Sequence, residues 1–186
     1  MDYKVILEAI KGKNVELRHD VDLSLISAYN MALLENEVGV KSIYYIRFDC
    51  DYYNPSSVDN VRILKLMEKM GHQIGLHVDS SQIDGYNNLI DYLREYENQG
   101  VINIFNFTFH INSEHTKEFR FGRYDGWENK SLVGKYISDS RGEFDQTKLD
   151  WIKDNDDFTL LIHPEWWMHK GTKKQIIAKA IKEILS

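Results

Sequence analysis

The feature of this sequence that most restricts its fold is a regular alternation of two hydrophobic patterns. Short apolar runs rich in β-branched and aromatic residues are typical of buried strands, and they occur at 14–18, 42–48, 73–76, 101–109, 134–138 and 158–162. Between them, apolar residues recur at helical spacing at 24–38, 58–70, 86–98 and 174–185. Strands that alternate with helices predict an α/β fold with a mostly parallel sheet, either open or barrel-like.

Glycines mark the ends of three predicted helices. Gly39, Gly71 and Gly100 stand where a left-handed C-cap is expected. The chain of 186 residues contains no linker-like stretch. We therefore expect one domain over residues 1–186, large enough to bury a sizeable core.

Composition excludes several classes of protein. A net charge of −6 argues against nucleic acid as the main partner, because phosphate binding depends on dense Lys and Arg. The single cysteine, Cys50, allows no internal disulfide. No apolar run approaches the roughly 18 residues of a membrane span, and MDYKVILEAIKGKN lacks the apolar centre of a signal peptide. We expect no membrane span and a cytoplasmic location, and the sequence leaves the oligomeric state open.

Every predicted strand is followed by an aspartate or a histidine. In chain order these residues are Asp20 and Asp22, Asp49 and Asp51, His77, His110, Asp139 and His163. The carboxyl ends of parallel strands share one edge of a sheet or barrel, and that edge carries the active site. The pattern therefore predicts that these side chains converge on a site for a metal ion or a substrate.

Some of these residues also have a purely structural interpretation. Asp22 fits the N-cap of the helix that follows it. His72 precedes its strand and is expected to be a satisfied structural residue, whereas His115 and His169 are expected to be solvated loop residues.

The segment after the last predicted strand combines a histidine with two tryptophans. Pro164 favours extended geometry at His163, which holds the imidazole on a stiff backbone suited to proton transfer. Trp166 and Trp167 either stack on a sugar ring or form a hydrophobic lid over the core.

Five segments, in their order along the chain, resemble the polysaccharide deacetylase superfamily (the NodB-type carbohydrate esterase domain). They are HDVD (19–22), GHQIGLH (71–77), FTFH (107–110), YISDSRG (136–142) and LLIHPEWW (160–167). Specifically, they are similar to its short WbmS-like branch, associated with bacterial surface polysaccharide synthesis. The resemblance implies a distorted, incomplete (β/α)6-7 barrel. It also implies metal-dependent removal of an N-acetyl group from a sugar or saccharide precursor.

The resemblance also assigns roles to individual residues. Asp20 matches the general base and Asp22 a metal ligand, while His77 matches the first histidine of an H-x-x-x-H ligand pair. His163 matches the general acid, and Asp139 matches an aspartate that helps tune the catalytic groups. The implied cofactor is a divalent ion, Zn²⁺ first and a harder ion such as Mn²⁺ if carboxylates dominate the ligand set.

The sequence departs from the family pattern at the second histidine ligand. Ser81 stands four residues after His77, and a hydroxyl is a poor replacement for imidazole on zinc. His110 is our candidate for the third ligand, and Asp79 and His19 are weaker candidates.

A second departure concerns the cation that tunes the base. HINS (110–113) replaces the arginine–proline pair of related sequences, so that Arg141 or Arg123 would have to supply the cation. Trp166 and Tyr53 are the aromatic residues that we expect to contact the substrate.

Three other functions fit parts of this pattern. A metal-independent glycosidase would use Asp20 and Glu165 as its carboxylate pair. A deacetylase-like module without activity would bind saccharide but turn nothing over. A metal-dependent hydrolase of another C–N bond is the third alternative.

Overall fold

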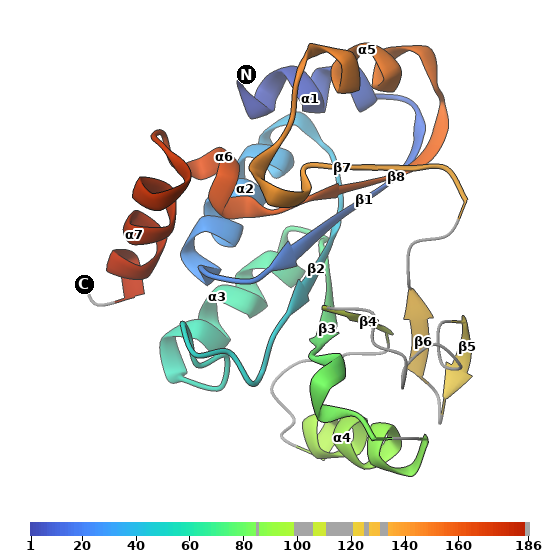
Figure 1. Ribbon diagram of the computed structural model, residues 1–186, viewed down its shortest axis with the longest axis vertical. Coiled ribbons are helices and arrows are strands. Elements are labelled where there is room, and N and C mark those ends of the chain that lie inside the picture. Colours follow the sequence, from blue (N-terminus) through green and yellow to red (C-terminus); the bar gives the residue numbers. More distant parts are fainter. Residues whose placement is uncertain (85, 99–105, 111–120, 125–126, 131–133, 185–186) are drawn as a thin grey trace.

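The centre of the molecule is an eight-stranded sheet with the strand order β5-β6-β4-β3-β2-β1-β8-β7 (Figure 1). The computed structural model describes residues 1–84, 86–98, 106–110, 121–124, 127–130 and 134–184. The strands are β1 (Asn14–Val21), β2 (Ile43–Ile46), β3 (Gln73–Val78), β4 (Asn106–Phe109), β5 (Phe121–Tyr124), β6 (Trp127–Lys130), β7 (Tyr136–Ser138) and β8 (Asp157–Ile162). Neighbouring strands pair in parallel except in the β5–β6 hairpin.

The sheet curls on itself. In the strand order β1 and β6 are separated by β2, β3 and β4, yet Nη1 of Arg18 in β1 donates to the carbonyl oxygen of Lys130 in β6 at 2.8 Å. A flat sheet would hold these strands far apart, because neighbouring strands are spaced by about 4.8 Å. The result is an incomplete (β/α) barrel, which confirms the predicted fold class.

Seven α-helices connect and cover these strands in the part of the chain that the structure describes. They are α1 (Tyr3–Ile10), α2 (Leu25–Val38), α3 (Val58–Lys69), α4 (Tyr86–Asn98), α5 (Gln146–Asp154), α6 (Pro164–Met168) and α7 (Lys173–Ile184). The predicted helices correspond to α2, α3, α4 and α7 within one residue at each end. Helices α1, α5 and α6 and the β5–β6 hairpin are additions to the predicted pattern.

Helix α2 illustrates how local sequence sets an element. Ser24 is its N-cap, and the Ser24 hydroxyl oxygen accepts from the backbone N–H of Ser27 at 3.0 Å. Gly39 ends it with φ of 77°, a left-handed conformation that glycine adopts without strain. The alternative interpretation of Asp22 as the cap is therefore wrong. Gly71 also has positive φ, whereas Gly100 lies outside the described residues.

The strands separate apolar from polar side chains by their alternation. Residues of one face form a hydrophobic cluster under α2, α3 and α4, which includes Val21, Tyr44, Ile46, Ile74, Leu76, Val78, Phe107 and Phe109. A second cluster under α1 and α5 includes Tyr3, Ile6, Leu7, Leu17, Leu149, Ile152, Leu160 and Ile162. The opposite, inner face of the curled sheet receives polar residues, among them Arg18, Asp20, His77 and Thr108.

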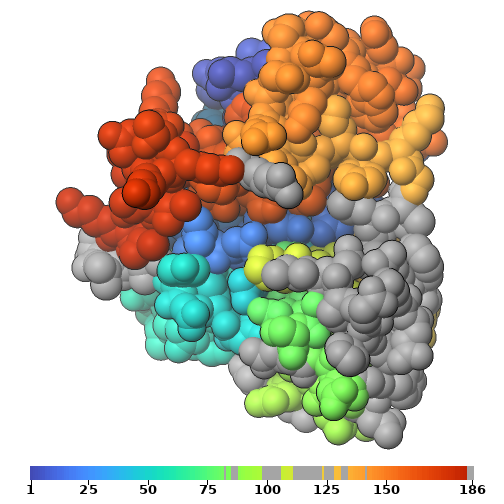
Figure 2. Space-filling view, viewed as in Figure 1, coloured from blue at the N-terminus to red at the C-terminus, as the bar shows by residue number. Residues whose placement is uncertain are grey.

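Part of the N-terminal region is central at the surface as well as in the sheet, whereas the N-terminus itself lies at the top edge (Figure 2). In the space-filling view, blue atoms form a band between the orange and red C-terminal segments and the cyan and green middle of the chain (Figure 2). Within the described residues, no helix has the length and apolar character needed to cross a membrane.

Candidate metal centre and catalytic site

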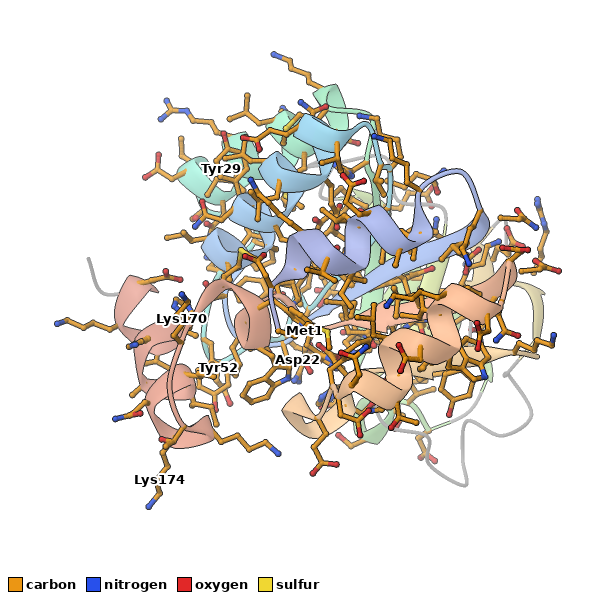
Figure 3. The ribbon with its side chains drawn as sticks, turned by 90° about the horizontal axis from the view of Figure 1, so that it is seen from above. Met1, Asp22, Tyr29, Tyr52, Lys170 and Lys174 are labelled. Carbon is orange, nitrogen blue, oxygen red and sulfur yellow. The ribbon has the colours of Figure 1, made fainter. Side chains whose placement is uncertain are left out.

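Three ligand-type side chains from three strand ends meet at the inner edge of the sheet. Asp22 directly follows β1, His77 is the penultimate residue of β3, and His110 directly follows β4. Their ligand atoms all lie within 4.8 Å of one another. The Asp22 Oδ1 atom is 3.6 Å from Nε2 of His77 and 3.5 Å from Nε2 of His110. Seen from above, Asp22 lies near the middle of the molecule, whereas Lys174 points outward from α7 (Figure 3).

This spacing fits three ligands of one divalent ion. Tetrahedral ligands at zinc distances are separated by about 3.3–3.4 Å, close to the two distances from Asp22. The Oδ1 atom of Asp22 is buried and has no hydrogen-bond partner in the described part of the chain. A buried carboxylate oxygen without a donor requires a positive charge nearby. One carboxylate and two imidazoles therefore make a suitable donor set for Zn²⁺ or a similar ion.

The protonation states also suit a metal centre. Burial raises the pKa of Asp22, but the neighbouring imidazoles of His110, His77 and His163 together lower it by more than burial raises it. The pKa of Asp22 therefore lies below its ordinary value. Burial lowers the pKa of His77 despite the nearby carboxylates of Asp20 and Asp22. An ionised aspartate and a neutral histidine are the forms that bind metal.

The other candidate ligands are engaged elsewhere. The backbone N–H and the hydroxyl of Ser81 both donate to Oδ1 of Asp79, at 2.9 and 2.8 Å, and Oδ2 of Asp79 accepts from Nη2 of Arg47 at 3.1 Å. His19 lies on the opposite face of β1, where its Nε2 atom is 2.7 Å from Glu35. The structure thus groups His110, and neither Asp79 nor His19, with Asp22 and His77.

Asp20 is held by an arginine of its own strand. Nη2 of Arg18 donates to Oδ1 of Asp20 at 2.7 Å, and Oδ2 lies 3.6 Å from Nε2 of His77. Burial raises the pKa of Asp20, but the charges of Arg18 and His77 lower it more, so that the carboxyl group stays ionised well below neutral pH.

Arg18 was not among the residues predicted for the site. The structure places Arg123 in the β5–β6 hairpin, paired with Glu128 at 3.8 Å, and gives Asp20 a different cation. Arg141 belongs to the 3-10 turn Ser140–Gly142, and its side chain lies outside the described residues. The signal for Arg18 was present in the sequence, because residues two apart in a strand point to the same face.

His163 and Asp139 form a hydrogen-bonded pair. Nδ1 of His163 lies 2.6 Å from Oδ1 of the fully buried Asp139. A carboxylate only accepts, so Nδ1 carries the proton and Nε2 faces the site, 3.9 Å from Oδ2 of Asp22. Burial lowers the pKa of His163, but Asp139, Asp20 and Glu165 raise it to about 9. At neutral pH His163 is therefore a proton donor.

The aromatic candidates occupy different environments. Tyr53 is buried, and its hydroxyl donates to the carbonyl oxygen of Val21 at 2.7 Å and accepts from the N–H of Arg47 at 2.8 Å. The indole ring of Trp166 rests against Gly142, and a small cavity beside it is also lined by Phe144 and Trp167.

Two histidines outside the site, His72 and His169, were interpreted from the sequence as a structural residue and as a solvated loop residue. His72 is buried, with Nε2 3.2 Å from the carbonyl oxygen of Ala32, which confirms it as a structural residue. The prediction of a solvated His169 is wrong, because its Nε2 atom lies 3.1 Å from the Ser27 hydroxyl and its side chain is only 10% exposed. This contact ties the segment after α6 to α2. His115 lies outside the described residues.

Comparisons with known proteins identify the fold. No family model and no curated protein matches the sequence. Among solved structures, a CE4 esterase of Streptococcus mutans aligns over 98% of this chain and 85% of its own, with 12% identity and a TM-score of 0.59. The peptidoglycan deacetylase PdaC of Bacillus subtilis aligns over 93% and 85%, with 16% identity and a TM-score of 0.56.

A third solved structure is that of a pseudoenzyme. BA3943 of Bacillus anthracis, described as a CE4 family pseudoenzyme, aligns over 95% of this chain with 11% identity and a TM-score of 0.56. The chain spans 62% of the length of that protein. At these identities the likeness shows the fold, which is that of the CE4 polysaccharide deacetylases.

Proposed function

We propose that this protein is a metal-dependent deacetylase that removes an N-acetyl group from a sugar or saccharide precursor. The observation that supports this most strongly is the arrangement around Asp22, His77 and His110. The carboxylate of Asp20 lies within 3.6 Å of His77, and Nε2 of His163 lies within 3.9 Å of Asp22. A base and an acid thus flank one set of metal ligands, as hydrolysis of an amide requires.

Each residue of the site has a defined task in this proposal. A bound divalent ion would lower the pKa of water to about 7 and polarise the amide carbonyl group. Asp20, kept ionised by Arg18, accepts the proton of the attacking water. His163, protonated at neutral pH, gives its Nε2 proton to the departing amine nitrogen. Asp139 orients the imidazole by accepting from Nδ1.

Finer features of the proposal follow from the resemblance of the sequence. We assign the protein to the WbmS-like branch, as one deacetylase domain in the cytoplasm that acts during surface polysaccharide synthesis, with Zn²⁺ as the ion. Trp166, Arg141 and Tyr53 remain predicted substrate-binding or tuning residues. Cell fractionation tests the compartment, and recovery of the protein outside the cell would contradict it.

A catalytically inactive saccharide-binding module is the second candidate function. Two observations favour it: Ser81 replaces a ligand of the family pattern, and one structural neighbour is a pseudoenzyme. The glycosidase alternative has no such support, because Glu165 is 1% exposed and so offers no accessible carboxyl group to a glycosidic bond.

Metal content of the purified protein decides between the candidates. We expect about one divalent ion per chain in the wild type and none in His77→Ala, while the control His169→Ala, which removes a histidine outside the site, keeps it. Screening of N-acetylated sugar precursors for acetate release follows. If the wild type took up no ion even in excess metal, the deacetylase proposal would fail and saccharide binding would be tested instead.

A further inference from the structure

We infer that Trp167 is a positioning residue for the proposed acid: its indole N–H holds Asp139, and Asp139 orients His163. This inference rests on the proposed deacetylase function for its catalytic consequence, but the contact itself is a feature of the folded chain. It also assigns a role to Trp167, the second tryptophan of the EWW segment (165–167).

The contacts of the Asp139 carboxylate carry the inference. Its Oδ2 atom accepts from Nε1 of Trp167 at 2.7 Å, and its Oδ1 atom accepts from Nδ1 of His163 at 2.6 Å. The backbone N–H of His163 is shared between the two oxygens, at 3.1 and 3.0 Å. Asp139 is fully buried, and a buried carboxylate requires donors for both oxygens. Without Trp167, Oδ2 keeps only its share of one N–H among the contacts that the structure describes.

The geometry of α6 explains why Trp167 reaches this carboxylate. His163 is the N-cap of α6, and Trp167 stands four residues later, one helical turn away on the same side. The indole ring packs against two other aromatic rings, with centroids at 5.7 Å for Tyr3 and 5.3 Å for Phe144. The N–H therefore points at Asp139 from a rigid support.

The neighbouring tryptophan has a different environment. A Cβ atom on Gly142 would lie 3.1 Å from Cδ2 of Trp166, and the ammonium group of Lys173 is 5.8 Å from the Trp166 ring centroid. Trp166 makes no described hydrogen bond to Asp139. Of the two tryptophans, only Trp167 forms a hydrogen bond within the described contacts to the pair made by Asp139 and His163.

The chemical effect of the contact is orientation. Asp139 determines which nitrogen of His163 carries the fixed proton and thus where Nε2 points. An Asp139 carboxylate that tilts toward a replacement donor would misdirect Nε2, while Asp22, His77 and His110 keep their places. Loss of the indole N–H should therefore lower kcat and leave KM and metal content unchanged.

The test compares Trp167→Phe with Trp151→Phe. Trp151 of α5 belongs to the same hydrophobic cluster and lies outside the site, and its ring packs edge-on against Phe158 with centroids 5.0 Å apart. The same chemical change there therefore controls for lost packing. We expect kcat of Trp167→Phe to fall on the order of tenfold, the effect of one hydrogen bond to a charged group, and kcat of Trp151→Phe to stay at the wild-type value.

A proton NMR measurement tests the contact without turnover. In wild type, the Nε1–H resonance of Trp167 and the Nδ1–H resonance of His163 should lie downfield. The Asp139→Asn change should move the Trp167 signal far more than that of Trp151. If the Trp167 signal did not move, or if Trp167→Phe kept full kcat, the inference would be overturned. Absence of acetate release from wild type would overturn the proposed function instead, and the NMR result would still decide the inference.

Discussion

Arg18 and Asp20, two residues apart in β1, form a buried ion pair with 2.7 Å between Nη2 and Oδ1. The guanidinium group also donates to Thr108 in β4 and to the carbonyl oxygen of Lys130 in β6, and it lies 4.6 Å above the ring of Tyr45 in β2. Asp20, the proposed base, is thereby linked to several strands of the half-barrel through the Arg18 side chain. The position of Asp20 depends on the curl of the sheet.

Replacement of Arg18 should separate catalysis from metal binding. We expect Arg18→Met to lower kcat by about 10²-fold or more, the lower range for a placed base, because Asp20 loses its fixed position. Arg18→Lys should restore little, since one ammonium group cannot span Asp20, Thr108 and the Lys130 carbonyl group. Acetate release measured beside metal content checks this. Full activity of either variant would contradict the assignment.

The third metal ligand can be tested by two substitutions. His110→Ala should lose the bound ion, because only Asp22 and His77 of the described ligand set remain. Ser81→Ala should keep it, because the Ser81 hydroxyl donates to Asp79. Elemental analysis of both purified variants gives the answer. Retention of metal by His110→Ala would shift the assignment toward Asp79, or toward Ser81 through a water molecule.

The pH dependence of kcat should report His163. Its pKa of about 9 means that the imidazole keeps its donor proton at neutral pH and loses it as the pH rises through 9, so that kcat falls on the alkaline side. Asp139→Asn removes the negative charge that raises this pKa and leaves at most a weaker, neutral acceptor for Nδ1, so the alkaline limb should move to lower pH. A pH–rate profile of the two proteins measures the shift. An unmoved limb would assign the alkaline titration to another group.

Glu35 should matter for stability and not for catalysis. It is fully buried on the outer side of β1, where it accepts from Tyr3, Ser42, Tyr44 and His19. Glu35→Gln leaves one acceptor oxygen where two oxygens served four side chains, and we expect a loss of about 3–5 kcal/mol in the free energy of unfolding, measured in urea. Metal content should be unaffected in the folded fraction.

The same residue makes the stability depend on acid. Burial raises the pKa of Glu35, but His19, Ser42 and Tyr3 lower it below its ordinary value of 4.5. A lowered folded pKa means that the contribution is complete above about 4.5 and is lost as the pH falls through the folded value. Glu35→Gln should therefore show a weaker decline of stability below that pH than the wild type. Identical declines would mean that other carboxyl groups account for it.

Most of the strands and helices, and the residues at the strand ends, could be predicted from the amino-acid sequence alone. Alternation along β1 and β3 and the C-cap Gly39 are local signals, readable because side-chain periodicity and backbone conformation depend on near neighbours, although the N-cap of α2 proved to be Ser24 and not Asp22. Asp22, His77 and His163 were identified by the same logic, since each lies at or just beyond the carboxyl end of a parallel strand.

The tertiary structure decided which partner each of these residues has. Arg18 meets Asp20 beside Thr108 and Lys130 only because the sheet curls until β1 faces β4 and β6. Trp167 turns toward Asp139 because His163 is the N-cap of α6 and because the Trp167 ring packs against Tyr3 of α1 and against Phe144. Contacts between distant segments depend on curvature and packing of the whole chain, and neither leaves a periodic mark in the sequence.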